Sequence, residues 1–253
     1  MKITNKKGTL IKDITSWENA FKEVDDAKHW KEGRSAMSLA QYFSLPNVEQ
    51  SNGIKLITEL VEACGFKEFK PIRADIEHES RFDKYNGKGR MHDLIIWEDN
   101  GTQHLVICIE AKVNESFGCL ISDAYREAVE YRKNNPQSKS AQRIKELCEK
   151  YYKVDIKELT STTDLRYQLL HYLAGAIVES KSCEDVVFMA IMVFKSKLYN
   201  NENTNKEDFH KFVTLTNFEL LNSEKCIYKK NINGVDLYVI KIPIIFSPLK
   251  CNK

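Results

Sequence analysis

The stretch RMHDLIIWEDNGTQHLVICIEAKVNESFG, residues 90–118, decides the predicted fold. Two short apolar runs rich in β-branched residues, 94–97 and 104–109, are bounded by polar residues, which is typical of strands. Asn100-Gly101 lies between them and favours a type I′ turn, because both of its residues tolerate positive φ. The stretch therefore predicts an antiparallel hairpin.

A two-residue turn at this dipeptide fixes which residues face each other. Counting back from it places Asp93 opposite Cys108, with Glu110 as the diagonal neighbour of Asp93. Because side chains alternate along a strand, Asp93, Glu110 and Lys112 are expected on one face. A four-residue loop would keep this parity, and a three-residue loop would break it.

Two carboxylates and an ammonium on one face of a strand pair predict a particular chemistry. Neighbouring carboxylates repel unless a cation lies between them, and Mg²⁺ prefers oxygen ligands while keeping several waters. Mn²⁺ is expected to substitute for it. Lys112 is placed to orient or help deprotonate one of those waters. These residue types suit metal-assisted hydrolysis of a phosphodiester, although a solvated surface pair is the plain alternative for any Glu-x-Lys.

Asp93 followed by Glu110-Ala111-Lys112 resembles the PD-(D/E)xK signature of nucleases with the restriction-endonuclease-like fold, with His92 in place of the proline. The resemblance implies an α/β fold whose α-β-β-β-α-β core is a mixed sheet flanked by helices. It also implies that the acid pair binds the metal and that the lysine assists the attacking water. The expected function is a Mg²⁺-dependent nuclease with DNA as its partner.

Further blocks are similar to those of an uncharacterised bacterial family of this fold, over roughly residues 29–195. They are HWKEGRSAMSLA, Glu77-His78, EAKVNESFG and RYQLLHYLAG. That family has no established substrate. Glu77 and Glu79 share one face of a predicted strand, and the resemblance favours Glu77 as a further catalytic and metal-binding acid. A half-exposed strand with a solvated charged face is the alternative.

Three more residues are candidates for contacts with a substrate phosphate: Arg166, Gln168 and Arg34. Gln168 and Tyr172 form a Gln-x-x-x-Tyr pattern that resembles a motif of the exonuclease-like branch of the same superfamily, with Arg166 nearby. Arg34 belongs to the GRSA block. The alternatives are a buried, hydrogen-bonded glutamine and an arginine paired with a surface acid.

The chain divides into three predicted parts of one domain. Residues 1–50 form an N-terminal helical appendage, residues 51–195 the nuclease-like core, and residues 196–253 a helix and a hairpin around Asn233-Gly234. Within the core, residues 54–64 have helical apolar spacing, and the uninterrupted apolar run 186–194 is typical of a central strand. The C-terminal hairpin is expected to extend the sheet or to form a dimer surface.

Composition narrows the class of protein. The 253 residues are 42% hydrophobic and 29% charged, which argues against disorder. The net charge of +2 supplies no global field for nucleic acid, so DNA contacts need a local basic patch. Seven cysteines without a CxxC pair, and no apolar leader, predict a cytoplasmic protein with reduced thiols. The longest apolar run is too short to span a bilayer, so no membrane partner is expected.

Two other functions fit the same residues. One is a catalytically inactive module of this fold that binds nucleic acid or a protein partner. The other is an oligomeric interaction protein, in the simplest case a homodimer, with the C-terminal hairpin as its interface.

Overall fold

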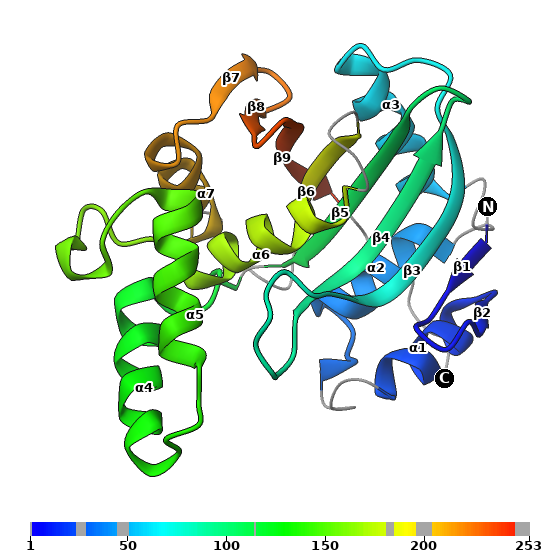
Figure 1. Ribbon diagram of the computed structural model, residues 1–253. Helices are drawn as coiled ribbons and strands as arrows, with labels where there is room; N and C mark the ends of the chain where they lie inside the picture. The colour runs from blue at the N-terminus through cyan, green and yellow to red at the C-terminus, as the bar shows by residue number, and fades with distance from the viewer. Residues whose placement is uncertain are drawn as a thin grey trace.

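A mixed β-sheet forms the centre of the fold (Figure 1). The computed structural model describes residues 2–23, 29–44, 51–113, 115–180, 185–195 and 204–245. Within these residues the sheet has nine strands in the order β2-β1-β3-β4-β5-β6-β9-β8-β7. The strands are β1 (Lys2–Thr4), β2 (Leu10–Ile11), β3 (Lys70–Ser80), β4 (Arg90–Asp99), β5 (His104–Lys112), β6 (Val186–Lys195), β7 (Glu219–Asn222), β8 (Ile227–Ile232) and β9 (Val235–Ile245).

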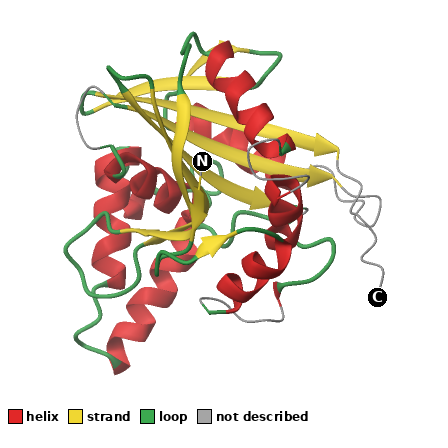
Figure 2. Ribbon diagram, turned by 90° about the vertical axis from the view of Figure 1, so that its right-hand side faces the viewer, coloured by secondary structure: helices red, strands yellow, loops and turns green. Residues whose placement is uncertain are grey.

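Helices cover both faces of the sheet (Figure 2). One face packs against α1 (Ile14–Lys22), α2 (Ser35–Ser44) and α3 (Asn52–Ala63). The other packs against α4 (Ile121–Asn134), α5 (Ser140–Leu147), α6 (Tyr167–Val178) and α7 (Thr204–Leu215), with a π-helical turn (Cys148–Tyr152) and a 3-10 turn (Ile156–Glu158). No helix in the described part of the chain is both long and apolar enough to cross a membrane.

The order of elements agrees with the expected mixed α/β class. After α3, strands β3, β4 and β5 form an antiparallel meander, and the chain then passes through helices to β6, which pairs with β5 in parallel. Residues 186–194 of β6 are all buried. This fits the uninterrupted apolar run of that segment, since a central strand covered on both faces has no solvent side.

The turn between β4 and β5 corrects the predicted register. Asp99 faces His104, so the loop has four residues instead of two. The Asn100 carboxamide oxygen accepts hydrogen bonds from the backbone N–H groups of Thr102 and Gln103, at 3.0 and 2.9 Å. These bonds stabilise the wider loop. Each residue of β4 therefore faces a partner two positions further along β5 than predicted, and the parity of faces is kept.

The N-terminal segment is more than a helical appendage. Its strand β1 pairs in parallel with β3, and β2 pairs with β1 at the edge of the sheet. These strands have three and two residues, too few for an alternating pattern to predict them. Residues 24–28 and 45–50 of this segment lie outside the described residues.

The C-terminal hairpin extends the sheet. Ile232 faces Val235, and the turn residues Asn233 and Gly234 have φ of 54° and 90°, as the Asn-Gly signal predicted. β9 also pairs in parallel with β6, so the end of the described chain lies inside the sheet. Homodimer formation through this hairpin stays a prediction.

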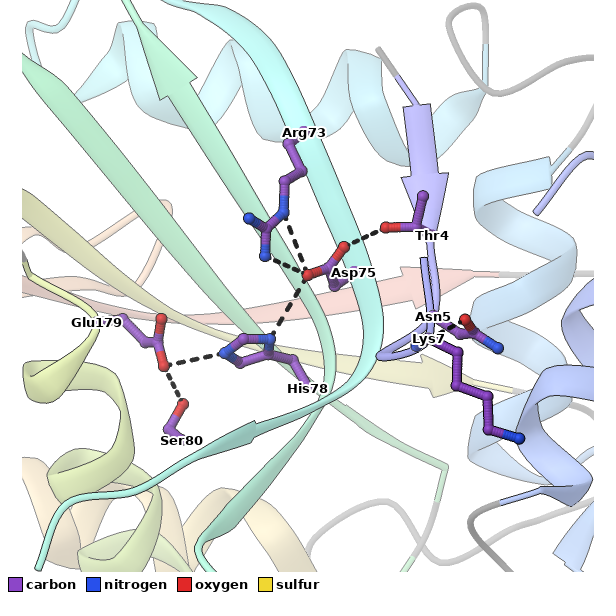
Figure 3. Close-up of polar contacts among 8 residues, drawn as sticks. All are labelled: Thr4, Asn5, Lys7, Arg73, Asp75, His78, Ser80 and Glu179. Atoms are coloured by element: carbon purple, nitrogen blue, oxygen red, sulfur yellow. Dashed lines mark hydrogen bonds and ion pairs between the residues drawn. The ribbon is translucent and has the colours of Figure 1, made fainter. Parts of the chain in front are cut away.

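An ionic network ties β1, β3 and the end of α6 together (Figure 3). The Asp75 carboxylate accepts from Arg73 and from the Thr4 hydroxyl, and lies 3.7 Å from His78 Nδ1. His78 Nε2 is 3.1 Å from Glu179 Oε1. Burial opposes a charge on His78, but the two carboxylates outweigh burial and raise the pKa of His78 to about 9.

This network predicts a pH dependence of stability. The contribution of His78 to the free energy of unfolding is complete below pH 6.5, its ordinary pKa, and is lost as the pH rises through about 9. We expect that loss to be roughly 1–2 kcal/mol, because the network borders solvent and is screened. Denaturant unfolding at several pH values between 6 and 10 measures it.

His78→Gln should remove this pH dependence, whereas His210→Gln, a change at an exposed histidine of α7, should leave it intact. An unchanged slope between pH 6.5 and 9 in the His78→Gln variant would contradict the assignment.

Candidate functional site

The regular backbone pairing between β4 and β5 ends at Leu94, the residue that follows Asp93 in the sequence. The last backbone pair is Leu94 with Ile109, so Asp93 lies across from Glu110 instead of Cys108. The Asp93 carboxylate itself accepts the backbone N–H of Ala111, at 2.7 Å. The Asp93 side chain thus takes the place of a backbone acceptor, and Glu110 is the residue across from Asp93 instead of its diagonal neighbour.

Glu110 is the centre of the site. Its Oε1 forms an ion pair with Lys112 Nζ at 3.0 Å and accepts a hydrogen bond from Gln168 Nε2 at 2.7 Å, and its Oε2 accepts from the Arg90 guanidinium. Glu110 is only 3% exposed. Two cations, from β4 and β5, and one neutral donor from α6 therefore stabilise a buried carboxylate that would otherwise be costly to desolvate.

The protonation of Asp93 depends on the charges around it. Its side chain is half-buried at the cavities, and desolvation together with the negative charge of Glu110 raises the pKa of Asp93 to about 7. The Ala111 N–H, Lys112 and Arg90 act in the opposite direction. Asp93 therefore gains a proton more easily than an ordinary aspartate, and added positive charge beside it would favour the ionised form.

Glu77 adjoins this pair on β3. Ile76 faces Leu94 and His78 faces His92, so Glu77 lies across from Asp93. Its φ is +48°, a left-handed conformation that costs a non-glycine residue of order 1–3 kcal/mol. Such strain inside a strand is concentrated at functional sites, which supports the choice of Glu77 over Glu79.

Two cavities meet at Asp93 and Glu77. One, of about 350 Å³, is also lined by Glu110, Gln168 and Arg90. The other, of about 300 Å³, extends toward the start of α2 and is lined by Arg34 and Ser35. The predicted residues Asp93, Glu77, Glu110, Gln168 and Arg34 are thus gathered along one continuous region.

Arg166 is not brought to this region. Its Nε donates to Asp208 of α7 at 2.9 Å, and its NH1 donates to the Gly118 carbonyl at 3.0 Å. These bonds tie the connection after β5 to α6 and α7. A structural role accounts for Arg166, and the predicted phosphate contact has no geometric support.

Arg90 is a residue of this cluster that sequence reasoning missed. It is 7% exposed, and its guanidinium lies over the Tyr172 ring at 5.2 Å from the centroid. Gly175 on α6 leaves room for it, because a Cβ at that position would lie 2.6 Å from Arg90 Cβ. A glycine inside an apolar helix signals a close approach of another element, and Gly175 was the available signal for this contact.

Tyr172 of α6 and His92 of β4 pack beside the cluster and support it. The Tyr172 hydroxyl donates to the Cys108 carbonyl at 2.5 Å and lies 3.3 Å from the Ala190 carbonyl. His92, packed against Tyr172, is fully buried, and burial with the charge of Arg90 lowers its pKa well below the ordinary value. His92 is therefore neutral and leaves the positive charges of the site to Arg90 and Lys112.

The carboxylates alone do not form a complete metal cage. Among the described residues, no group of three or more His, Cys, Asp or Glu side chains is arranged to hold a metal ion. Asp93 and Glu110 remain as two oxygen donors on neighbouring strands. Mg²⁺ in proteins is commonly held by one or two carboxylates with waters completing its shell, so this pair fits such an ion.

The fold and the site together define a mixed α/β protein with a buried acid–base cluster at one end of its sheet. A family model described as "Domain of unknown function (DUF6946)" matches residues 10–244, and the chain belongs to this family. The match covers all of the residues gathered at the site. Comparison with curated proteins finds no match. Comparison with solved structures finds none either.

Gly175→Ala tests the contact that holds Arg90. The added Cβ overlaps Arg90 and comes within 3.1 Å of His92 Nε2, so overpacking is expected to lower the free energy of unfolding by about 1–3 kcal/mol. Denaturant unfolding checks this. Val178→Ala, a change at a partly exposed position of the same helix, should stay within about 0.5 kcal/mol of the wild type. Equal stability of both variants would show that Arg90 does not need this space.

Proposed function

We propose that the protein is a metal-dependent nuclease that hydrolyses DNA phosphodiester bonds. The observation that carries the proposal is that Asp93 and Glu110 line one cavity large enough for a phosphate group, with Lys112 paired to Glu110 behind it. The same three residues carry the resemblance to the PD-(D/E)xK signature. Arg90 and Gln168, which contact Glu110, add two donors of the kind that bind phosphate oxygens.

Asp93 and Glu110 are the residues that would hold Mg²⁺, with Mn²⁺ as a substitute. Glu77 lines the same cavity and is the third candidate acid. Positive charge at this point would offset both the burial of Asp93 and its repulsion by Glu110, the two causes of its raised pKa. A divalent ion bound there would stabilise the charge that develops on the phosphodiester.

The chain's own donors would position the reactants. Lys112 Nζ, 3.0 Å from Glu110 Oε1, can donate a hydrogen bond to the attacking water and orient it. When substrate binds, Arg90 and Gln168 would donate hydrogen bonds to the oxygens of the scissile phosphate in place of Glu110. Arg34, at the second cavity, is placed to contact a neighbouring phosphate of the strand. The carboxylates would thus bind the metal, and these donors would bind the substrate.

Substitutions at the cluster test catalysis. Asp93→Asn and Lys112→Ala should each lower the rate of cleavage of plasmid and linear DNA in Mn²⁺ by about 10²–10⁴-fold, because one removes a metal ligand and the other the group that serves the water. A gel-based cleavage assay at fixed protein concentration measures the rate.

Lys70→Ala is the matched control, because Glu68 and Lys70 repeat the Glu-x-Lys spacing at exposed positions of the chain. This variant should cleave at the wild-type rate. Wild-type cleavage by either cluster variant, or equal loss in the control, would refute the assignment.

An inactive binding module is the second candidate function. The observation that favours it is that both oxygens of Glu110 already accept hydrogen bonds from protein donors, so the cluster is satisfied without a metal. Such a module would bind nucleic acid or a protein partner through the same region and would not need Mg²⁺.

Metal-linked stability separates the two functions. If Asp93 and Glu110 bind Mg²⁺, a concentration of 100 times its Kd should stabilise the wild type by about 2.7 kcal/mol, because only the folded state binds. Asp93→Asn should abolish this stabilisation. Thermal unfolding with increasing Mg²⁺ measures it, and an absence of any metal effect on the wild type would favour the binding module.

A further inference from the structure

The two cavities that share Asp93 and Glu77 are bordered by different parts of the chain. Arg34, just before α2, lines one of them. Lys6, which follows β1, and Lys88, in the connection between β3 and β4, line the other. All three cations are exposed, so each cavity is open to solvent on its own side of the two shared acids.

These cations are not used by the fold. Within the described part of the chain, no hydrogen bond or ion pair engages the side chain of Arg34, Lys6 or Lys88. By contrast Lys7, the neighbour of Lys6, pairs with Glu23 at 3.0 Å. Lysine and arginine side chains of this kind are the usual partners of the phosphate oxygens of a nucleic acid.

The turn that carries Lys6 is held by a buried side chain. Asn5 is 6% exposed, and its Oδ1 accepts the backbone N–H groups of Lys7 and Thr9, at 3.0 and 2.9 Å (Figure 3). The Asn5 carbonyl also accepts the N–H of Gly8, at 2.8 Å. Lys6 therefore projects from a fixed backbone, which reduces the conformational entropy lost when it binds a ligand.

The connection that carries Lys88 is held from two sides. Arg143 of α5 donates NH1 to the Lys88 carbonyl at 3.0 Å, and its Nε lies 2.6 Å from Asp83 Oδ2. On the other side, Glu79 Oε1 accepts the N–H of Gly89 at 2.8 Å. The backbone at Lys88 is thus fixed beside the cavity, and the acid Glu79 of the same cavity is engaged in holding it.

Positive charge therefore lies on both sides of Asp93 and Glu77. Arg34 supplies it on one side, and Lys6 and Lys88 supply it on the other. Every nucleotide of a strand carries a phosphate, so a strand that continues past the site in both directions needs cations on both sides. A site that accepts only the end of a strand needs them on one side.

We propose that the substrate strand runs through both cavities, so that the protein cleaves DNA within the strand and not from its end. Arg34 binds a phosphate on one side of the scissile bond, and Lys6 and Lys88 bind phosphates on the other. The inference rests on the proposed nuclease function and adds the mode of cleavage to it. Hydrolysis breaks one P–O bond, the hydroxyl of water goes to phosphorus and its proton to the leaving oxygen, so each cut of a linear strand leaves two polynucleotide fragments.

Binding without cleavage tests the path of the strand. A fluorescently labelled single-stranded oligodeoxynucleotide is titrated with the full chain in EDTA at several salt concentrations, and anisotropy gives the affinity. Each phosphate contact contributes about 0.7 to the slope of log K against log salt concentration for a single strand. Arg34→Ala should therefore reduce the slope by about 0.7, and the double variant Lys6→Ala/Lys88→Ala by about 1.4.

Lys7→Ala is the matched control, because Lys7 lies on the same turn as Lys6 but is paired with Glu23. Its slope should equal that of the wild type. A wild-type slope in Arg34→Ala or in the double variant, or an equal reduction in the control, would overturn the inference.

Substrates without ends test the mode of cleavage. The full chain is incubated in Mn²⁺ with covalently closed circular DNA, duplex and single-stranded, and with the matching linear molecules. Circles should be opened, and linear DNA should give fragments of intermediate length at early times. Lys112→Ala should leave the circles intact, which excludes a contaminating nuclease.

The outcomes separate this inference from the function on which it rests. Digestion of linear DNA alone, with mononucleotides released from its ends, would overturn the inference and leave the nuclease function standing. Cleavage of neither form would refute the nuclease function and, with it, the mode of cleavage.

Discussion

The hydrogen bonds and the ion pair of the Glu110 carboxylate are the constraint on which the site depends. A buried carboxylate is tolerated only when donors surround it, and here the donors come from three elements: Arg90 from β4, Lys112 from β5 and Gln168 from α6. The charge of Glu110 is therefore stabilised only when β4 and β5 keep their register and α6 keeps its position. Tyr172, which bonds the Cys108 carbonyl, holds α6 at the distance that Gln168 needs.

Local patterns predicted the elements that form the site. The run 104–109 predicted β5, and the apolar spacing of residues 54–64 predicted α3. The Asn233-Gly234 dipeptide predicted the turn of the C-terminal hairpin. The prediction that Asp93, Glu110 and Lys112 lie close together was correct, because parity survives when a loop grows by two residues.

The remaining features depend on contacts between distant parts of the chain. The Asn100 side chain widens the turn, a choice that an Asn-Gly dipeptide does not reveal. Arg90 reaches Glu110 only because Gly175, 85 positions later, leaves space for it. The pairing of Arg166 with Asp208 likewise requires α7 to lie beside α6. Periodicity within one segment contains no information of this kind.

The strand order also has a consequence for synthesis of the chain. β6 is paired on one side by β5 and on the other by β9, which leaves the ribosome after β6, β7 and β8. Until β9 has been made, β6, which is apolar over residues 186–194, has an open edge of unpaired backbone groups, the kind of edge on which nascent chains associate. Chaperone capture during translation would therefore be most useful in the interval between the emergence of β6 and that of β9.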